Sequence, residues 1–161
     1  MVEEGCPFCG VLYGGLMKTQ NGIKVIEFNA RFGDPETEVI LPRMTSDICQ
    51  VFCDIVDGKQ PSITWNDQAT LGIVLASKGY PGSYEKGYAI KGTDKVDGSI
   101  YHMGTALKDG EYVTSGGRVM IVVCQAPTLR EAQQKAAAEV AKIECENLFH
   151  RSDIGDKAFK Y

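Results

Sequence analysis

The stretch Val25–Glu38, V-I-E-F-N-A-R-F-G-D-P-E-T-E, decides the fold because it begins as a strand and ends as the start of a helix. Alternate side chains of an extended chain point to the same side, so one face of this strand carries Glu27, Asn29 and Arg31. The opposite face is apolar and is expected to pack against a core. Its side chains are those of Ile26, Phe28 and Ala30.

The polar face combines groups that suit phosphoryl transfer. The carboxylate of Glu27 and the amide oxygen of Asn29 suit Mg²⁺, which takes hard oxygen ligands and is often shared with substrate phosphates. The guanidinium of Arg31 suits the negative charge that builds up in such a reaction. The other interpretation is a solvated strand face on which the arginine pairs with a neighbouring glutamate. The residues alone leave both interpretations open.

The turn after the strand predicts a helix start. Gly33 permits a backbone conformation that other residues resist, Asp34 is a candidate N-cap, and Pro35 fits the first helical position. Glu36 and Glu38 follow in the first turn, where the helix dipole favours negative charge. We therefore expect a short helix that begins at Pro35.

The residues before this stretch predict a hairpin. Val11–Met17 is apolar around a pair of glycines, and the Asn21-Gly22 dipeptide is a strong hairpin signal. Ile23–Asn29 is then expected to return as the antiparallel partner strand. The candidate metal ligands would therefore lie on the second strand of the hairpin.

A second helix and a domain boundary are expected further along. Ser46 is a candidate N-cap for this helix, and Asp57 with the glycine after it marks the end. The helix has an apolar stripe that is expected to lie in the core, formed by Ile48, Val51, Phe52 and Ile55. Residues 59–66 are polar and are the best candidate for a boundary. We therefore expect two domains, residues 1–60 and residues 61–161.

Length, composition and charge exclude several classes of protein. The chain has 161 residues, of which 43% are hydrophobic and 24% are charged, so one or two small packed domains are expected. A net charge of -4 and a pI of about 5.2 argue against a nucleic-acid partner, which requires clustered Lys and Arg. There is no apolar run of membrane-spanning length and no signal-peptide pattern, so we expect a cytoplasmic protein with no membrane partner.

The chain contains six cysteines, which allow two interpretations. Cys6 and Cys9 form C-P-F-C, a spacing found in zinc sites and in redox pairs. A four-thiolate zinc site would also require Cys49 and Cys53, at a looser spacing than structural zinc sites show. Against this, Cys53 falls on the apolar face of the expected helix, and free cysteines are among the most buried residues. We therefore favour buried, free thiols and expect no disulfide framework.

The second half of the chain is expected to be mostly β. Ala69–Ser77 predicts a buried strand and runs into K-G-Y-P-G-S-Y, residues 78–84. A glycine-rich loop with a lysine can offer backbone N–H groups to a phosphate. Proline followed by glycine, here Pro81 and Gly82, also fits a type II turn, and composition alone favours the turn.

Further strands and one long helix complete the expected second domain. A strand interrupted at Gly104 is followed by a hairpin signal at Asp109 and the glycine after it. Arg118, beside two glycines, suits either a bound phosphate or carboxylate or an ion pair with a neighbouring acid. Thr128 begins a capping box and predicts a long amphipathic helix. The tail, residues 151–161, is expected to be a last strand or an extended arm.

Five short motifs occur in a fixed order along the chain. R-F-G-D-P-E occupies residues 31–36. The others are A-S-K-G-Y-P-G at 76–82, H-M-G-T at 102–105, G-G-R-V at 116–119 and R-S-D-I-G at 151–155. In these motifs the chain resembles the glycinamide ribonucleotide synthetase (phosphoribosylamine–glycine ligase) family of the ATP-grasp superfamily. It departs from that family at Glu38, where the family usually has glutamine.

The resemblance implies an α+β fold and an incomplete enzyme. The chain would be the C-terminal piece of an ATP-grasp module, with an antiparallel hairpin and helices, followed by a small, mostly β C-terminal domain with one long helix. The substrate domain and the ATP lid that precede this region in the family are not found. We therefore expect the chain to be inactive without the missing N-terminal part. Its severed edge is expected to expose apolar surface that favours self-association.

The resemblance also implies a two-step ligation in purine synthesis, with ATP as co-substrate. ATP phosphorylates glycine, and 5-phosphoribosylamine attacks the glycyl phosphate, so positioning and charge stabilisation dominate. Glu27 and Asn29 are then implied to hold Mg²⁺ or Mn²⁺, and Arg31 to stabilise the transferred group. The turn implied to face the substrates consists of Gly33, Asp34 and Pro35. The residues implied to help close the site over phosphoribosylamine are Lys78, Gly79, Tyr80, Pro81, Thr105 and Arg118.

Three kinds of function stay open at this point. The first is a portion of the ligase that acts only with its missing part. The second is a catalytically inactive module that serves in protein interactions. The third is a small zinc or thiol protein that uses Cys6 and Cys9.

Overall fold

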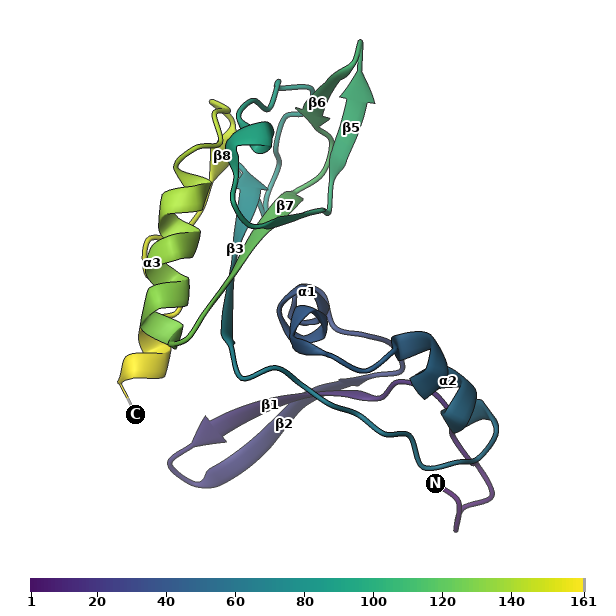
Figure 1. The fold of residues 1–161 in the computed structure, drawn as a ribbon. Coiled ribbons are helices and arrows are strands. Elements are labelled where there is room, and N and C mark those ends of the chain that lie inside the picture. The colour runs from purple at the N-terminus through teal and green to yellow at the C-terminus, as the bar shows by residue number, and fades with distance from the viewer. Residues whose placement is uncertain (161) are drawn as a thin grey trace. The chain divides into compact units, whose positions relative to one another are not determined.

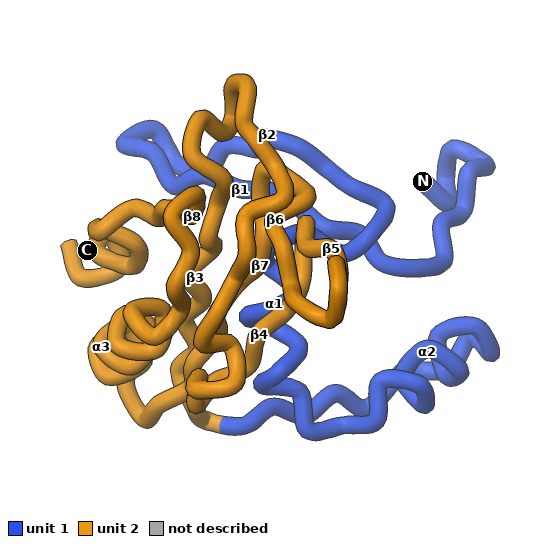
Figure 2. Tube along the Cα trace, turned by 90° about the horizontal axis from the view of Figure 1, so that it is seen from above, with its two compact units in different colours: residues 1–66 blue, residues 67–161 orange. Residues whose placement is uncertain are grey.

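The computed structural model describes residues 1–160, which form two compact units (Figure 2). The first unit comprises residues 1–66, and the second begins at residue 67. This part of the chain combines antiparallel sheets with three α-helices, as predicted for the α+β class (Figure 1). None of its helices is both long and apolar enough to cross a membrane.

The first unit is built around a two-stranded antiparallel hairpin. Its strands are β1 (Tyr13–Thr19) and β2 (Gly22–Asn29), in agreement with the hairpin predicted from the sequence. The strands are joined by Gln20 and Asn21, because Thr19 pairs with the first residue of β2.

A β-bulge in this hairpin decides which side chains share a face. Gly15 pairs with Glu27, whereas the next residue of β1 pairs with Val25, so Ile26 is an extra residue in β2. A shift of one residue moves the side chains on one side of the bulge to the opposite face. Val25 therefore lies on the same face as Phe28, whereas strict alternation would have placed it with the carboxylate.

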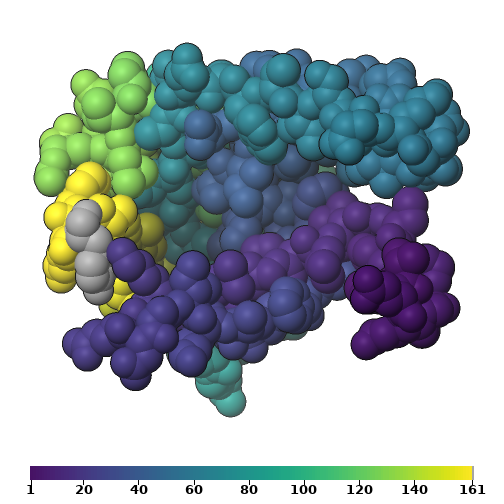
Figure 3. Space-filling model, turned by 90° about the horizontal axis from the view of Figure 1, so that it is seen from below, coloured from purple at the N-terminus to yellow at the C-terminus, as the bar shows by residue number. Residues whose placement is uncertain are grey.

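The apolar face of the hairpin is open to solvent. Ile23 is 70% exposed and Phe28 is 64% exposed, and the hairpin is visible at the surface as the purple and blue-purple residues of Figure 3. Within residues 1–66, all of which the structure describes, Val51 is the one buried hydrophobic side chain. The first unit therefore has almost no hydrophobic core, and the expectation that Ile26 and Phe28 pack into one is wrong for this chain.

The first helix begins one residue later than predicted. α1 spans Glu36–Ile40 and continues into a 3-10 turn, Leu41–Arg43. The N-cap is Pro35, and the helix start has no side-chain capping hydrogen bond from that residue. The backbone N–H of Thr37 instead donates to the carbonyl of Gly33 at 3.1 Å, which closes the first turn. The predicted N-cap is therefore wrong, and the proline lies before the helix.

The second helix, α2, spans Ile48–Val56 and is also capped by a different residue from the one predicted. The carboxylate of Asp47 accepts hydrogen bonds from two backbone N–H groups of the first turn. Ser46 is not available as the cap, because its hydroxyl accepts the N–H of Thr64 at 2.9 Å. Of the predicted apolar stripe, only Val51 is buried.

The second unit has a four-stranded antiparallel sheet with the order β4-β7-β3-β8. Its strands are β4 (Ser99–His102), β7 (Arg118–Ala126), β3 (Ala69–Ser77) and β8 (Leu148–Phe149). A separate hairpin, whose turn Asp109 and Gly110 form as predicted, consists of β5 (Thr105–Lys108) and β6 (Glu111–Thr114). A 3-10 turn at Thr93–Lys95 precedes β4.

The long helix α3 (Leu129–Val140) covers one face of this sheet (Figure 1). Its start carries the predicted capping box between Thr128 and Glu131. Side chains from three elements form the core between helix and sheet: Leu71, Ile73, Leu75, Met120, Val122, Cys124, Ala132, Ala136 and Val140. The second unit therefore holds itself together by burial of apolar surface.

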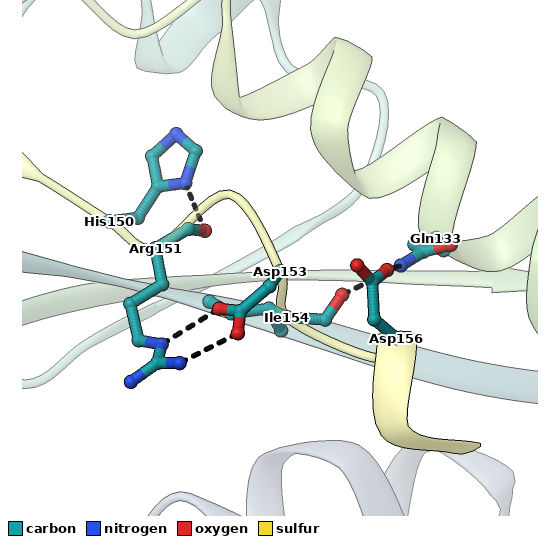
Figure 4. A network of polar contacts seen from close by, with 6 residues as sticks. All are labelled: Gln133, His150, Arg151, Asp153, Ile154 and Asp156. Atoms are coloured by element: carbon teal, nitrogen blue, oxygen red, sulfur yellow. Dashed lines mark hydrogen bonds and ion pairs between the residues drawn. The ribbon is translucent and has the colours of Figure 1, made fainter. Parts of the chain in front are cut away.

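The tail packs against α3 and is neither the strand nor the arm that was expected. Gln133 of α3 donates to the carbonyl of Ile154 at 2.8 Å and to Asp156 at 2.7 Å (Figure 4). Arg151 donates to both carboxylate oxygens of Asp153 and lowers the pKa of that carboxyl to about 2. A 3-10 helix over residues 156–159 ends the described chain, and Tyr161 lies outside it.

A buried carboxylate on α3 anchors the loop before β4. Glu139 is 6% exposed, and it accepts the backbone N–H of Asp97 at 2.6 Å and the ammonium of Lys142 at 2.6 Å. These hydrogen bonds favour the ionised form, so the pKa of Glu139 lies below its ordinary value, with the bond from the lysine as the largest cause.

Replacing Glu139 by glutamine is predicted to destabilise the second unit in a pH-dependent way. The charge stabilises the fold above the ordinary pKa of 4.5, and this stabilisation is lost as the pH falls through the lowered folded pKa. Urea unfolding of Glu139→Gln should therefore show a deficit of about 1–2 kcal/mol near neutral pH, and the deficit should shrink in acid. Glu144→Gln is the control, because this carboxylate is exposed and lies 3.8 Å from the ammonium of Lys95 in a surface ion pair. A deficit that is independent of pH would contradict the prediction.

Candidate functional site

The polar face of the hairpin brings together the first pair of candidate ligands. Glu27 and Asn29 pair with Gly15 and Tyr13 of β1, which lie on the same face as each other. A Cβ placed on Gly15 would lie 3.1 Å from Cγ of Glu27, so the glutamate side chain lies over the glycine. A Cβ on the neighbouring Gly14 would instead contact the ring of a β2 phenylalanine, which lies on the opposite face.

Tyr13 links this face to the start of α1. Its hydroxyl donates to Oε1 of Glu36 at 3.0 Å. That hydrogen bond is the main reason why the pKa of Tyr13 is raised, with smaller contributions from burial and from the charges of Glu36 and Glu27. The charge of Arg31 lowers the pKa of Tyr13 and so acts in the opposite direction.

The turn residues predicted to face substrates have different surroundings. Gly33 is buried, and a Cβ there would lie 2.5 Å from Oε2 of Glu36, so a larger residue would displace that carboxylate. Asp34 is exposed, and its peptide bond to Pro35 is cis. The guanidinium of Arg31 is exposed and donates to the carbonyl of the next residue at 2.7 Å.

The donor set on the polar face fits a divalent cation with hard oxygen ligands. Glu27 supplies an exposed carboxylate, and Asn29 is half-buried beside it. The amide nitrogen of Asn29 is buried and has no hydrogen-bond partner among residues 1–160. Because the oxygen and nitrogen of an amide are assigned by their partners, the reversed amide would present its oxygen at that position. Mg²⁺ and Mn²⁺ accept such a pair and complete their coordination with water or phosphate oxygens.

The second group of predicted residues comes from loops of the second unit that contact one another. A Cβ on Gly117 would lie 2.3 Å from the ring of Tyr80, so the tyrosine packs flat on this glycine. A Cβ on Gly104 would lie 2.7 Å from Cα of Gly116. Ser77, at the end of β3, donates its hydroxyl to the carbonyl of Gly116 at 2.8 Å. The K-G-Y-P-G, H-M-G-T and G-G-R-V motifs are therefore joined, although they are far apart in sequence.

The K-G-Y-P-G turn differs from the type II turn that composition favoured. The N–H of Gly82 donates to the carbonyl of Gly79 at 2.8 Å, which places Pro81 third in the turn. The Tyr80-Pro81 peptide bond is cis, as a proline in that position requires. Lys78, just before the turn, is exposed.

Several residues around the two groups were not predicted from sequence. His102 and the Thr105 hydroxyl are 2.9 Å apart, and the histidine ring lies 4.6 Å from that of Tyr112. The H-x-G-T spacing could have suggested this turn contact. Tyr13 and Glu36 were missed because their contact depends on the register of the hairpin, which the bulge sets.

The cysteines do not form the cluster that a zinc site would require. Cys6, Cys9, Cys49 and Cys53 are all free and exposed, which corrects the expectation that Cys53 is buried. The thiol of Cys9 lies 3.8 Å from the carbonyl of Ile55. Across the described residues, no three His, Cys, Asp or Glu side chains are placed to share a metal ion.

Comparison with known proteins gives a consistent result for both units. The family model of the phosphoribosylglycinamide synthetase C domain matches residues 70–157, and that of the ATP-grasp (A) domain of the same synthetase matches residues 1–37. A phosphoribosylamine–glycine ligase of Halalkalibacterium halodurans is 53% identical over 160 residues, which cover 98% of this chain and 37% of the relative. A ligase of the same name from Streptococcus pneumoniae is 47% identical, over 99% of this chain and 39% of the relative.

A solved structure agrees with the fold. The crystal structure of phosphoribosylamine–glycine ligase from Thermotoga maritima superposes with a TM-score of 0.79 at 34% identity. The match covers 89% of this chain and 36% of that one. The chain therefore spans less than two-fifths of the length of these relatives.

The contact between the loops predicts the effect of one added methyl group. Gly117→Ala should lower the free energy of unfolding by about 1–3 kcal/mol, because the new Cβ would overlap the ring of Tyr80. In a Tyr80→Ala background the ring is absent, and the same substitution should cost much less. Urea unfolding of the four proteins, followed by circular dichroism, measures both costs. Equal costs in the two backgrounds would mean that the ring does not pack on Gly117.

Proposed function

Because the chain belongs to the phosphoribosylglycinamide synthetase family, we propose that it is the C-terminal portion of a phosphoribosylamine–glycine ligase. It takes part in the ATP-dependent joining of glycine to 5-phosphoribosylamine. The observation that carries this proposal is the polar face of Glu27 and Asn29, which lies on the strand matched by the ATP-grasp model. That face offers two oxygen donors for a metal ion. The guanidinium of Arg31 follows two residues after Asn29.

Each residue of this face has a role that follows from its chemistry. Glu27 and Asn29 hold Mg²⁺ or Mn²⁺ against the phosphates of ATP. When bound, the ion offsets the negative charge of the phosphates during transfer. Arg31 lies beyond the end of β2 and stabilises the phosphoryl group that passes to the carboxylate of glycine. Gly33, with the two residues after it, shapes the turn that faces the substrates.

The joined loops of the second unit form a proposed binding region of their own. They close over phosphoribosylamine, whose amine displaces phosphate from the activated glycine. Lys78, Tyr80 and Arg118 offer two cations and an aromatic ring for its phosphate and sugar. The shape of the two turns is set by three further residues, Gly79, Pro81 and Thr105. The contacts of Tyr80 on Gly117 and of Gly104 on Gly116 support the proposal, since they hold these turns together.

The same proposal requires a second component. The first unit, which carries the candidate ligands, has almost no core, and its hairpin exposes apolar side chains on both strands. Burial of that surface is needed to hold the polar face still. We propose that the rest of a ligase, which the relatives possess and this chain does not match, supplies the covering surface.

The exposed hairpin also favours a second candidate function, a non-catalytic interaction module. Such a module would also bind a partner through the apolar face of the hairpin, but this binding would not depend on Glu27. The zinc or thiol alternative, based on Cys6 and Cys9, has no comparable support, because these thiols lie apart from any third ligand in the described residues.

A reconstitution experiment separates these functions. The chain is mixed with a fragment that supplies the remainder of the H. halodurans relative, and ADP formation is measured with glycine and 5-phosphoribosylamine. The chain alone should be inactive, and the mixture should be active. No activity at any ratio would exclude the ligase proposal and leave the interaction module. Activity of the isolated chain would overturn the need for a second component.

The metal assignment has its own test in the reconstituted mixture. Glu27→Gln should lower activity by roughly a hundredfold or more and shift its dependence on Mg²⁺, since charge stabilisation by a metal is worth several kcal/mol. Asp57→Asn is the matched control, because this carboxylate is exposed and pairs with Lys59 away from the hairpin. A wild-type Mg²⁺ dependence in Glu27→Gln would remove this residue from the metal site.

A further inference from the structure

We infer that Tyr13 and Glu36 form a positioning pair that fixes the metal-binding face of the hairpin to the start of α1. This inference rests on the proposed function, because it concerns the site formed by Glu27 and Asn29. Neither residue is placed here as a metal ligand. The pair acts by holding β1, the strand paired with the one that carries the ligands, to the start of α1.

The first support is the location of Tyr13. It pairs directly with Asn29 across the hairpin, and its hydroxyl donates to Oε1 of Glu36 at 3.0 Å. The hydrogen bond therefore joins the residue opposite one ligand to the helix that follows the strand. Its acceptor is charged, which makes such a bond roughly twice as strong as one between neutral groups.

The second support is the shape of the turn beneath Glu36. Its carboxylate folds back over Gly33, where a Cβ would lie 2.5 Å from Oε2. The carbonyl of Gly33 in turn accepts both the N–H and the hydroxyl of Thr37. The glutamate is therefore seated on a turn that is itself fixed to the helix, and it presents its other oxygen to the tyrosine.

The third support is the apolar surroundings of this bond. Tyr13 and Glu36 border a cavity of about 180 Å³, whose remaining lining is mostly aliphatic and aromatic. The apolar residues of this lining are Val11, Leu12, Phe32, Ile40 and Leu41. The bond itself is partly buried, so the loss of either partner removes a hydrogen bond that water replaces only in part.

The need for such a pair follows from the hairpin itself. A two-stranded ribbon is marginally stable in water, and this one has no core behind it. A divalent ion such as Mg²⁺ requires its oxygen ligands at about 2.0–2.1 Å in a near-ideal geometry. A contact that limits the swing of β1 against α1 therefore keeps the carboxylate and the amide oxygen within reach of one ion.

The test measures Mn²⁺ binding by the reconstituted mixture, in which the whole 161-residue chain or a variant of it is combined with the fragment of the relative, with electron paramagnetic resonance of the free ion as the readout. Tyr13→Phe and Glu36→Ala should each weaken binding about tenfold, as changes behind a metal ligand commonly do. The double variant should be no weaker than either single one, because both remove the same bond. Glu36→Gln keeps an acceptor oxygen but not the charge, so it should bind Mn²⁺ more tightly than Glu36→Ala.

A matched control removes a similar bond elsewhere. Tyr88 also donates its hydroxyl to a glutamate, Glu85, in the second unit. Tyr88→Phe should therefore leave Mn²⁺ binding unchanged. Far-ultraviolet circular dichroism of each variant shows whether the fold persists. If Tyr13→Phe unfolds the hairpin, the comparison of Glu36→Gln with Glu36→Ala still tests the inference, which requires the glutamine variant to bind Mn²⁺ more tightly than the alanine variant.

The contrary outcomes are distinct. Unchanged binding in Tyr13→Phe would overturn the positioning pair and leave the metal site intact. Weak binding in Glu36→Gln, with normal binding in Tyr13→Phe, would make Glu36 a ligand and also overturn the pair. If the reconstituted wild-type mixture binds no Mn²⁺ at millimolar concentrations, the metal site of the proposed function fails, and the pair loses its role with it.

Discussion

One extra residue in β2 determines the character of the first unit. The bulge at Ile26 changes the pairing so that Val25 and Phe28 lie on one face, and Glu27 and Asn29 lie on the other. Without it, two β-branched residues would share the face of the candidate ligands. The bulge thus separates an oxygen-rich face from an apolar face on a ribbon only two strands wide. The remaining features of the unit, including the contact of Tyr13 with α1, depend on that separation.

The two units are stabilised in different ways. In the second, strand β7 contains Val119, Met120 and Val122 with no exposed surface, and α3 covers them from one side of the sheet. In the first unit, individual hydrogen bonds take the place of a packed hydrophobic core. A hydrogen bond such as that between Tyr13 and Glu36 fixes a geometry, but it contributes little net stability compared with a buried core. The candidate metal site therefore lies in the less stable part of the chain.

Sequence reasoning succeeded where the signal is local. The hairpin turn, the boundaries of β3 and the capping box at Thr128 follow from neighbouring residues, and the structure has them. Sequence reasoning failed where the structure depends on a hydrogen bond with a residue far away in the sequence. Ser46 cannot cap α2 because Thr64 occupies its hydroxyl, and the tail folds onto α3 because Gln133 provides its hydrogen bonds. The hydrophobic pattern showed which residues favour burial, but it could not show that this chain lacks the surface to bury them.

For the candidate site the same distinction applies. Alternation along one strand was enough to place Glu27 beside Asn29, because no partner is needed to define the face of a strand. The contact of Tyr80 with Gly117 could not be derived, since nothing in the spacing of the motifs shows that their loops meet. Tyr13 escaped notice because its position opposite Asn29 depends on where the bulge falls.

Within the part of the chain that the structure describes, the hairpin has no neighbouring strand on either side. Backbone groups along such free edges can recruit further strands from other molecules, and the β-branched and aromatic side chains of β2 reinforce that tendency. A cell that makes this polypeptide with the ribbon uncovered would therefore expose an edge that can pair with further strands. Chaperones and proteases act on such surfaces, so the amount of the chain that persists in the cell should follow the supply of whatever covers the ribbon.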